Sequence, residues 1–185
     1  DAAGDSVDVY LNGTLLLDNF AFRTATRFID APAGQVALAV APKNSTSAAD
    51  AFYNVSPTLT ASSTYVVVAE GIASPTGYNP APGFALNVYP MGQEAAGSST
   101  NTDVLVVHGS TDAPMVDVRA GSNVLVDDIS YGEFSAGYLN LPTDDYTLSI
   151  TNSAGTATVA RYAAPLQTLN LAGQAIVVLA SGYLN

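Results

Sequence analysis

The sequence predicts an all-β protein made of two tandem immunoglobulin-like antiparallel β-sandwich modules. Short runs rich in Val, Leu, Thr, Tyr and Phe end at Gly, Pro, Asn or Asp about every 8–12 residues, which is typical of sandwich strands. No stretch of about 12 residues has an apolar period near 3.6 with capping residues at both ends, so helices are not expected. The Cys-Trp-Cys pattern of true immunoglobulin domains is absent, so only the architecture is predicted.

An internal repeat predicts that there are two modules rather than one. Several segments recur in the same order, at an offset that drifts only from 109 to 111 residues. The matched segments are residues 7–9 with 116–118, 15–18 with 124–127, 28–32 with 138–142, and 66–71 with 177–182. We therefore predict module 1 at residues 1–91, a small polar linker at 92–102, and module 2 at 103–185.

The repeat also predicts that each module is one strand short, at opposite ends. The counterpart of the strand expected at residues 104–108 would precede residue 1. The counterpart of the strand expected at residues 83–89 would follow residue 185. A sandwich that lacks a strand exposes unpaired backbone groups and an apolar groove, which together form a template for another chain.

Local patterns predict the individual strands. Residues 7–11 and 14–17 flank Asn12-Gly13, a pair that readily adopts the positive φ angles of a type I′ hairpin turn. Residues 35–40 and 146–150 alternate with period two, as half-buried strands do. Residues 65–68 and 176–179 are continuous apolar runs, which suit a central strand covered on both faces; period alone leaves a buried helix turn as the alternative. Asp8 and Asp117 each stand between two valines, so their side chains are expected to point outward into solvent.

Composition excludes several classes of protein. There are no cysteines, which excludes disulfides and Cys-based zinc sites. Five Lys and Arg against 16 Asp and Glu leave a net charge of −11, which disfavours binding to nucleic acid or to an anionic membrane. No apolar run approaches the ~18 residues of a membrane span, so membrane insertion is not expected.

His108 is the only histidine, and therefore the only residue that could serve as the base of a hydrolase triad. A hydrolase would need it close to Ser110 or Asp112, and alternation along one strand can place the three on one face. The same alternation is equally compatible with a structural role, in which the imidazole holds the turn before Ala113-Pro114. We favour the structural role, because module 1 has no counterpart of His108.

Acidic residues raise the question of calcium or glycosidase chemistry. Three acidic pairs provide the oxygen ligands that calcium prefers: Asp127-Asp128, Asp144-Asp145, and Asp5 with Asp8. No D-x-D-x-D-G loop is present. Asp is also common in turns because it bonds its own backbone. The three glutamates do not repeat between modules, so a glycosidase pair has no support beyond their presence. We expect no cofactor, with calcium as the alternative.

Asn44 is the most plausible of three glycosylation sequons, because it lies in an expected loop at residues 42–47. The other two sequons begin at Asn12 and Asn54. Three sequons are close to the number expected by chance in a chain rich in Ser and Thr, so the signal is weak.

Residues 108–118 (HGSTDAPMVDV), followed by a short turn and residues 124–126, resemble the opening signature of the bacterial and archaeal surface domain of unknown function 4397. Residues 5–13 and 31–34 carry the same likeness in module 1. Arg119 departs from the pattern, which usually has an aromatic residue there. The resemblance implies a secreted or cell-surface β-sandwich, often in tandem, and implies no reaction.

We therefore expect a non-enzymatic extracellular or cell-surface module with a structural or interaction role. Strand addition from a neighbouring copy would complete the modules and form an assembly or a filament. The expected strand-pairing edges are Val7, Val9, Val104, Val106, Phe84, Leu86 and Val88. The alternative for the missing strands is that they lie outside this sequence or were lost by cleavage. The alternative function is adhesion to a surface glycan or protein through the loops at residues 42–47 and 74–82, with Tyr78 as a stacking residue.

Overall fold

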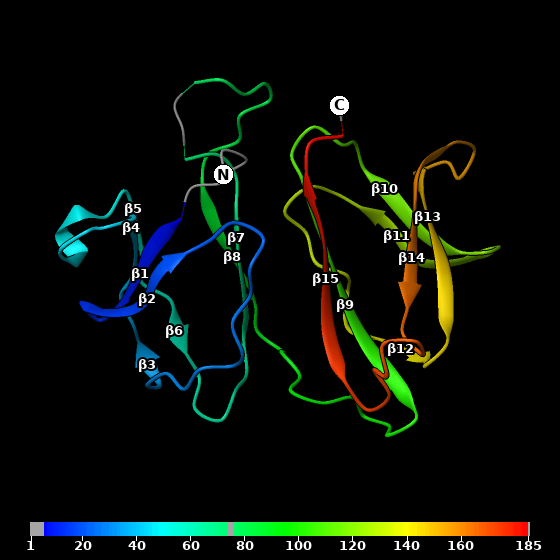
Figure 1. The fold of residues 1–185 in the computed structure, drawn as a ribbon, viewed down its shortest axis with the longest axis horizontal. Helices are drawn as coiled ribbons and strands as arrows, with labels where there is room; N and C mark the ends of the chain where they lie inside the picture. Colours follow the sequence, from blue (N-terminus) through cyan, green and yellow to red (C-terminus); the bar gives the residue numbers. More distant parts are fainter. Residues whose placement is uncertain (1–5, 74–75, 185) are drawn as a thin grey trace. The chain divides into compact units, whose positions relative to one another are not determined.

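The computed structural model describes residues 6–73 and 76–184, which fall into two compact units, Asp1–Pro90 and Met91–Asn185. Both units consist of short strands joined by turns, and the described part contains one 3₁₀ turn and no α-helix (Figure 1). The prediction of an all-β, two-module protein is confirmed. Eight strands in unit 1 and seven in unit 2 are found among the described residues.

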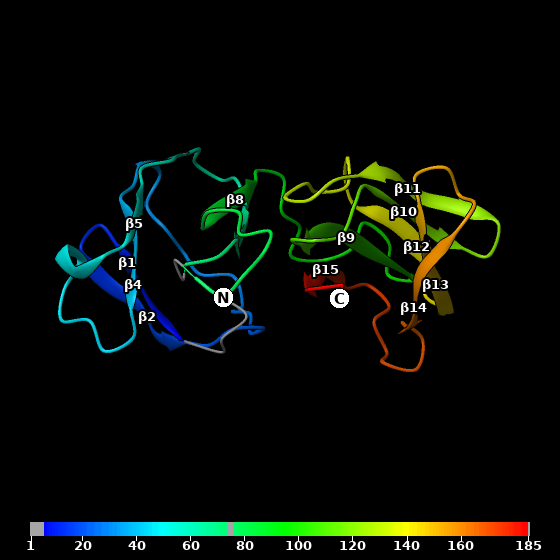
Figure 2. The ribbon, with the colours of Figure 1, turned by 90° about the horizontal axis from the view of Figure 1, so that it is seen from above.

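Unit 1 contains a four-stranded antiparallel sheet and two smaller strand pairs. The sheet has the order β2-β1-β4-β5, formed by Thr14–Phe20, Val7–Leu11, Leu38–Pro42 and Tyr53–Val55. The 3₁₀ turn η1, at Ala48–Asp50, connects β4 to β5. The pairs are β3 (Gly34–Gln35) with β6 (Thr58–Leu59) and β7 (Val66–Glu70) with β8 (Ala85–Tyr89). In Figure 2, β8 lies apart from the layer that contains β1, β4 and β5.

Unit 2 contains a similar four-stranded sheet and a second sheet of three strands. The first has the order β11-β10-β13-β14, formed by Asn123–Ile129, Val116–Ala120, Asp145–Asn152 and Thr158–Pro165. The second has the order β12-β9-β15, formed by Leu139–Pro142, Asn101–Ser110 and Ala175–Gly182. Val106 and Leu139 of this sheet pack on a core cluster formed by Val116, Val118, Val126 and Ile129.

The first hairpin of each unit has the same pairing register, including the positions of its register shifts. β1 pairs with β2 from Val7↔Phe20 to Leu11↔Thr14, and β10 pairs with β11 from Val116↔Ile129 to Ala120↔Asn123. Both pairs slip in register at the same two points. The hairpin turn has the predicted geometry, with φ of 50° at Asn12 and 80° at Gly13.

Two strand predictions need correction. The sandwich is not wholly antiparallel, because β15 runs parallel to β9 over eight residue pairs. Most of unit 2 separates these two strands along the chain, which gives the long connection that a parallel pair needs. The apolar runs in β7 and β15 were expected in central strands, but each forms the edge of its sheet in the described part of the chain.

The polar stretch expected as a linker packs on unit 2. Ala96 N–H donates to the carbonyl of Gly173, and Gly97 N–H donates to the Asp103 carboxylate. Strand β9 begins at Asn101, two residues before the expected boundary. Backbone groups in this stretch are therefore satisfied by unit 2 rather than by solvent alone.

Candidate functional site

The outer edge of β15 is one of the two longest open strand edges in the described chain, equal in length to that of β14 (Thr158–Pro165). β15 pairs with β9 on one side and with no described strand on the other. Val177, Val178 and Leu179 are 41, 39 and 40% exposed, and residues 175–182 contain no charged residue and no proline. Natural edges are commonly protected by charge, proline or bulges, and this one has none of these devices.

Another open edge, one of several in the described chain, is that of β7 in unit 1. β7 pairs with β8 alone, in the register that sets Val67 opposite Val88. Both valines are exposed, at 47 and 39%. Residues 28–32 are also exposed in unit 1, and they include Phe28 and Ile29 at 48 and 47%.

The predicted edge residues fall into two groups. Val7 and Val9 lie on β1, between β2 and β4, whereas Val104 and Val106 lie on β9, between β12 and β15. These strands are paired on both sides, so the four valines offer no free edge, which corrects the prediction. Leu86 and Val88 lie on β8, which pairs with β7 alone.

Phe84, the remaining predicted edge residue, immediately precedes β8. Its ring stacks edge-to-face on Phe52 and Tyr53, with centroid separations of 5.3 and 5.2 Å. The β15 edge and Val67 were not predicted as sites. The signal that could have found them is the uncharged apolar run itself.

Asp8 and Asp117 are buried, which corrects the expectation that they face solvent. They are 1 and 0% exposed. Asp8 Oδ1 accepts a 2.8 Å hydrogen bond from Asn19 N–H, and Asp117 Oδ1 accepts the equivalent bond of 3.1 Å from Asp128 N–H. Asn19 and Asp128 both have φ of 51°, at the slip in the hairpin register. Each carboxylate therefore holds a bulge of the neighbouring strand.

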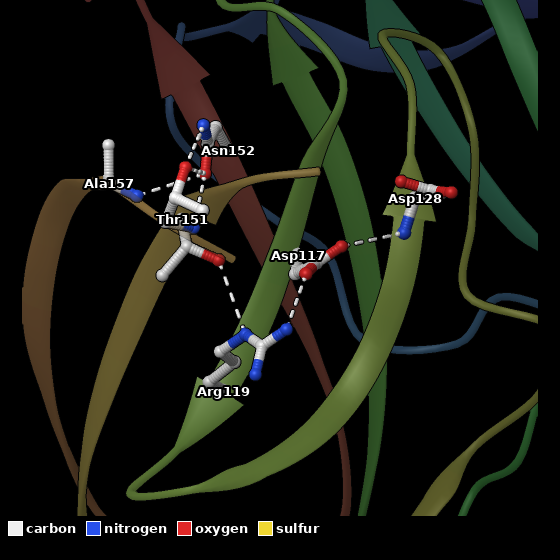
Figure 3. A network of polar contacts seen from close by, with 7 residues as sticks. Asp117, Arg119, Asp128, Thr151, Asn152 and Ala157 are labelled. Atoms are coloured by element: carbon white, nitrogen blue, oxygen red, sulfur yellow. Dashed lines mark hydrogen bonds and ion pairs between the residues drawn. The ribbon is translucent and has the colours of Figure 1, made fainter. Parts of the chain in front are cut away.

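The second oxygen of each aspartate has a different partner in each unit. Asp8 Oδ2 accepts from the backbone N–H and the hydroxyl of Ser45, at 2.9 and 2.7 Å. Asp117 Oδ2 forms a 2.9 Å ion pair with Arg119, whose Nε donates to Thr151 (Figure 3). The Arg119 departure from the family pattern thus supplies a partner for Asp117.

These contacts lower the pKa of both aspartates. For Asp8 the main cause is the bond from Asn19 N–H, followed by the Ser45 hydroxyl. For Asp117 the main cause is the bond from Asp128 N–H, followed by Arg119. Both carboxylates remain ionised over the physiological pH range, as hydrogen-bond acceptors in a structural role.

Asp117, Asp127 and Asp128 bring carboxylate oxygens within 4.8 Å of one another. Asp127 and Asp128 are exposed, whereas both oxygens of Asp117 already accept hydrogen bonds. Arg119 neutralises part of the negative charge at this point. The geometry adds no evidence for calcium beyond the acidic cluster, and calcium binding stays a prediction.

His108 has the contact expected of a structural histidine. It is 3% exposed, and its Nε2 lies 3.1 Å from the carbonyl oxygen of Pro114. A carbonyl only accepts, so Nε2 carries a proton and donates it to Pro114. Ser110 donates to Asp112 at 3.4 Å instead of to the imidazole. The hydrogen bonds in the described residues therefore do not assemble the Ser-His-Asp relay that a hydrolase would need.

Glu70 is a buried acid that the sequence did not single out. It is 7% exposed, and its Oε2 accepts a 2.7 Å bond from the side-chain amide of Asn87. Its Oε1 is buried and has no hydrogen-bond partner among the described residues. Burial raises the pKa of this carboxyl, and the bond from Asn87 offsets only part of that effect.

The loop residues proposed for glycosylation or adhesion are only partly accessible. Asn44 is exposed, with φ of 64°, while Ser45 of its sequon bonds to Asp8. Tyr78 is half-buried and already has an interaction partner in the chain. Residues 74 and 75 of the second loop lie outside the described residues. Glycosylation and glycan binding stay predictions.

Comparison with known families agrees with the repeat in the fold. The model of a domain of unknown function (DUF4397) matches residues 2–84 and again residues 102–184. The chain belongs to the DUF4397 family. As a tandem DUF4397 protein it has one family domain in each structural unit. No curated protein matches it. None of its described helical segments is long and apolar enough to cross a membrane.

Proposed function

We propose that this tandem DUF4397 chain is a non-catalytic, extracellular or cell-surface assembly module, in which neighbouring copies add strands to one another at open sheet edges. The observation that carries the proposal is the β15 edge. Its sequence is that of a strand covered on both faces, yet three of its four large apolar residues, Val177, Val178 and Leu179, are about 40% exposed. An apolar strand with free backbone donors and acceptors is a template for strand addition.

Edge pairing through β15 requires no strand to leave its place. β15 keeps its bonds to β9 and offers its other edge to a second copy. If two β15 edges pair, the contact is the same on both copies and closes a dimer. If β15 pairs with a different edge, the contact is head-to-tail and propagates a filament.

The non-catalytic part of the proposal is supported by the engagement of the only histidine with a backbone carbonyl. The extracellular part is supported by the family resemblance. The absence of cysteine and the charge of −11 are compatible with a secreted chain that stays dissolved. Adhesion to glycan is not favoured by any contact in the described loops.

Sedimentation velocity and light scattering on the whole chain, over a range of concentrations, test the proposal. We expect reversible self-association that strengthens with ionic strength, because added salt screens the repulsion between copies carrying −11 each. Val178→Lys places a charge on the β15 edge and should weaken association at least tenfold. Val67→Lys, at the matching position of unit 1, should associate like the parent chain if two β15 edges pair with each other, and should weaken association if β15 pairs with β7. A strict monomer at millimolar concentration in high salt would overturn the proposal.

A further inference from the structure

One side of unit 2 has a groove between the edges of its two sheets. β11 is an edge strand of the four-stranded sheet, and β12 is an edge strand of the three-stranded sheet. A cavity of about 300 Å³ lies between residues 125–127 of β11 and residues 135–139, which lead into β12. We call this cavity the β11–β12 groove. Its volume is at the lower end of the range of pockets that hold small molecules.

The floor of the β11–β12 groove is apolar. Val126 is 8% exposed and belongs to the core cluster of unit 2, and Leu139 packs against the same cluster. Leu125 and Tyr138, which also line the groove, are half-buried. An apolar body that displaces water from this floor therefore gains the favourable free energy of apolar burial.

The hydroxyl groups that line the groove are already engaged within the chain. Ser135 Oγ accepts a 3.0 Å hydrogen bond from Val106 N–H and donates its own hydrogen to the carbonyl of Gly137 at 2.9 Å. Tyr138 Oη accepts a 3.2 Å hydrogen bond from Gln93 N–H, which fixes the position of the ring at the groove. These contacts hold the shape of the groove and leave Asp127 as the polar side chain that faces a ligand.

Asp127 gives the groove a negative charge at its rim. It is exposed, and it is the only charged residue among those that line the cavity. Its carboxylate lies within 4.8 Å of the carboxylates of Asp117 and Asp128, and Arg119 neutralises only one of the three, through its ion pair with Asp117. An ionised carboxylate only accepts hydrogen bonds. The polar end of a complementary ligand must therefore donate hydrogen bonds and carry a positive charge.

We propose that the β11–β12 groove binds a small free organic amine in its cationic form, with an apolar tail on the floor and the ammonium group at Asp127. The orientation follows from the buried position of Val126 and the exposed position of Asp127. A lysine side chain of a partner protein has the wrong polarity, because its ammonium tip would enter first and its tail is joined to a polar backbone. This site goes beyond the self-association proposed at β15, since β12 and β15 are opposite edges of one sheet.

NMR titration of the isotope-labelled whole chain with hexylammonium chloride tests the site. We expect saturable shifts of the amide signals of residues 125–127 and 135–139. Hexanol has the same tail without the charge, and it should bind about fivefold more weakly, as expected for loss of a partly exposed ion pair. Methylammonium has the charge without the tail, and its binding should not reach saturation.

Two variants separate the charge of the groove from its shape. Asp127→Asn should weaken hexylammonium binding about fivefold and leave hexanol binding unchanged. Ala136→Phe places a large side chain in the groove from an exposed position, so it should weaken the binding of both compounds. Asp18→Asn, at the matching position of unit 1, is the control and should leave both affinities unchanged.

A lysine derivative blocked as amides at its α-amino and carboxyl groups tests the orientation, and it should bind several-fold more weakly than hexylammonium. Shifts that spread over the acidic surface without saturation would overturn the inference. Equal binding of hexanol, equal binding of the lysine derivative, or no effect of Ala136→Phe would also overturn it. Val178→Lys should leave hexylammonium binding unchanged. A strictly monomeric chain that binds hexylammonium in the groove would therefore remove the proposed function and leave this site standing.

Discussion

The buried carboxylate of Asp8 accepts a 2.8 Å hydrogen bond from the backbone N–H of Asn19, across a slip in the hairpin register. The equivalent bond joins Asp117 and Asp128 in the second unit, 109 residues later. At a bulge, pairing between strands leaves a backbone N–H group without a partner. A buried carboxylate that accepts a hydrogen bond from this group therefore stabilises the bulge. The repeated aspartate is therefore a structural element of the fold rather than a solvated strand residue.

Substitution of this aspartate should destabilise the unit that contains it. Asp8→Asn keeps the size of the side chain but replaces one accepting oxygen with a donor, which then faces an N–H group. We expect the unfolding midpoint of unit 1 to fall by several degrees in calorimetry. Asp18→Asn is the control, because Asp18 is exposed beside the same bulge and should leave the midpoint nearly unchanged. Equal midpoints for the two variants would contradict the structural role.

The same aspartates should make the fold sensitive to acid. Their pKa values are lowered in the folded chain by hydrogen bonds that the unfolded chain lacks. The unfolded state therefore binds protons first, and the stabilisation is present above the ordinary carboxyl pKa of 3.8 and is lost as the pH falls toward the folded values. Thermal unfolding followed from pH 6 to pH 2 should show midpoints that fall below about pH 4. The fall of the unfolding midpoint per pH unit should be smaller in a chain that carries both Asp8→Asn and Asp117→Asn.

The sequence predicts the features of the fold that depend on neighbours in the chain. The hairpin at Asn12-Gly13 and the order of the repeated segments are of this kind, because turn geometry and strand period are local. The burial of Asp8 does not depend on neighbours in the chain, because its hydrogen-bond partner Ser45 comes from a loop 37 residues away. Alternation along β1 correctly puts Asp8 on the face opposite its valines, but it does not say whether that face is covered.

The positions of the open edges are also non-local. The run at residues 176–179 has the composition of a central strand, and its place at an edge depends on which strands lie beside it. The neighbours differ even between the repeated strands, because β15 pairs with β9 in unit 2 whereas its counterpart β7 pairs with β8 in unit 1. The parallel pairing of β15 with β9 could not be inferred from either segment alone.

Glu70→Gln tests how far the buried carboxylate of Glu70, whose Oε1 has no hydrogen-bond partner among the described residues, lowers the stability of unit 1. Burial raises the pKa of Glu70, so between the ordinary value of 4.5 and its folded value the folded state binds the extra proton. Stability from this group is therefore present below pH 4.5 and is lost as the pH rises through that window. We expect Glu70→Gln to raise the unfolding midpoint of unit 1 at pH 7 and to change it little at pH 4. A lower midpoint at pH 7 would show that the charged form is stabilised by a contact that burial does not explain.

Alanine substitutions at Gly71 and Gly13 separate two causes of destabilisation, the steric overlap of a new side chain and the strain of a positive φ. Their φ values are 83° and 80°, so an alanine is strained to a similar degree at both positions, by roughly 1 kcal/mol. A Cβ at Gly71 would overlap the Gly83 carbonyl oxygen, far inside van der Waals contact, whereas a Cβ at Gly13 meets nothing within 4 Å. The Gly83 contact is to backbone and cannot be relieved by a change of rotamer. We expect Gly71→Ala to lower the unfolding midpoint of unit 1 well beyond the effect of Gly13→Ala. Equal effects of the two substitutions in calorimetry would mean that the loop after β7 moves away from Gly71 at little cost.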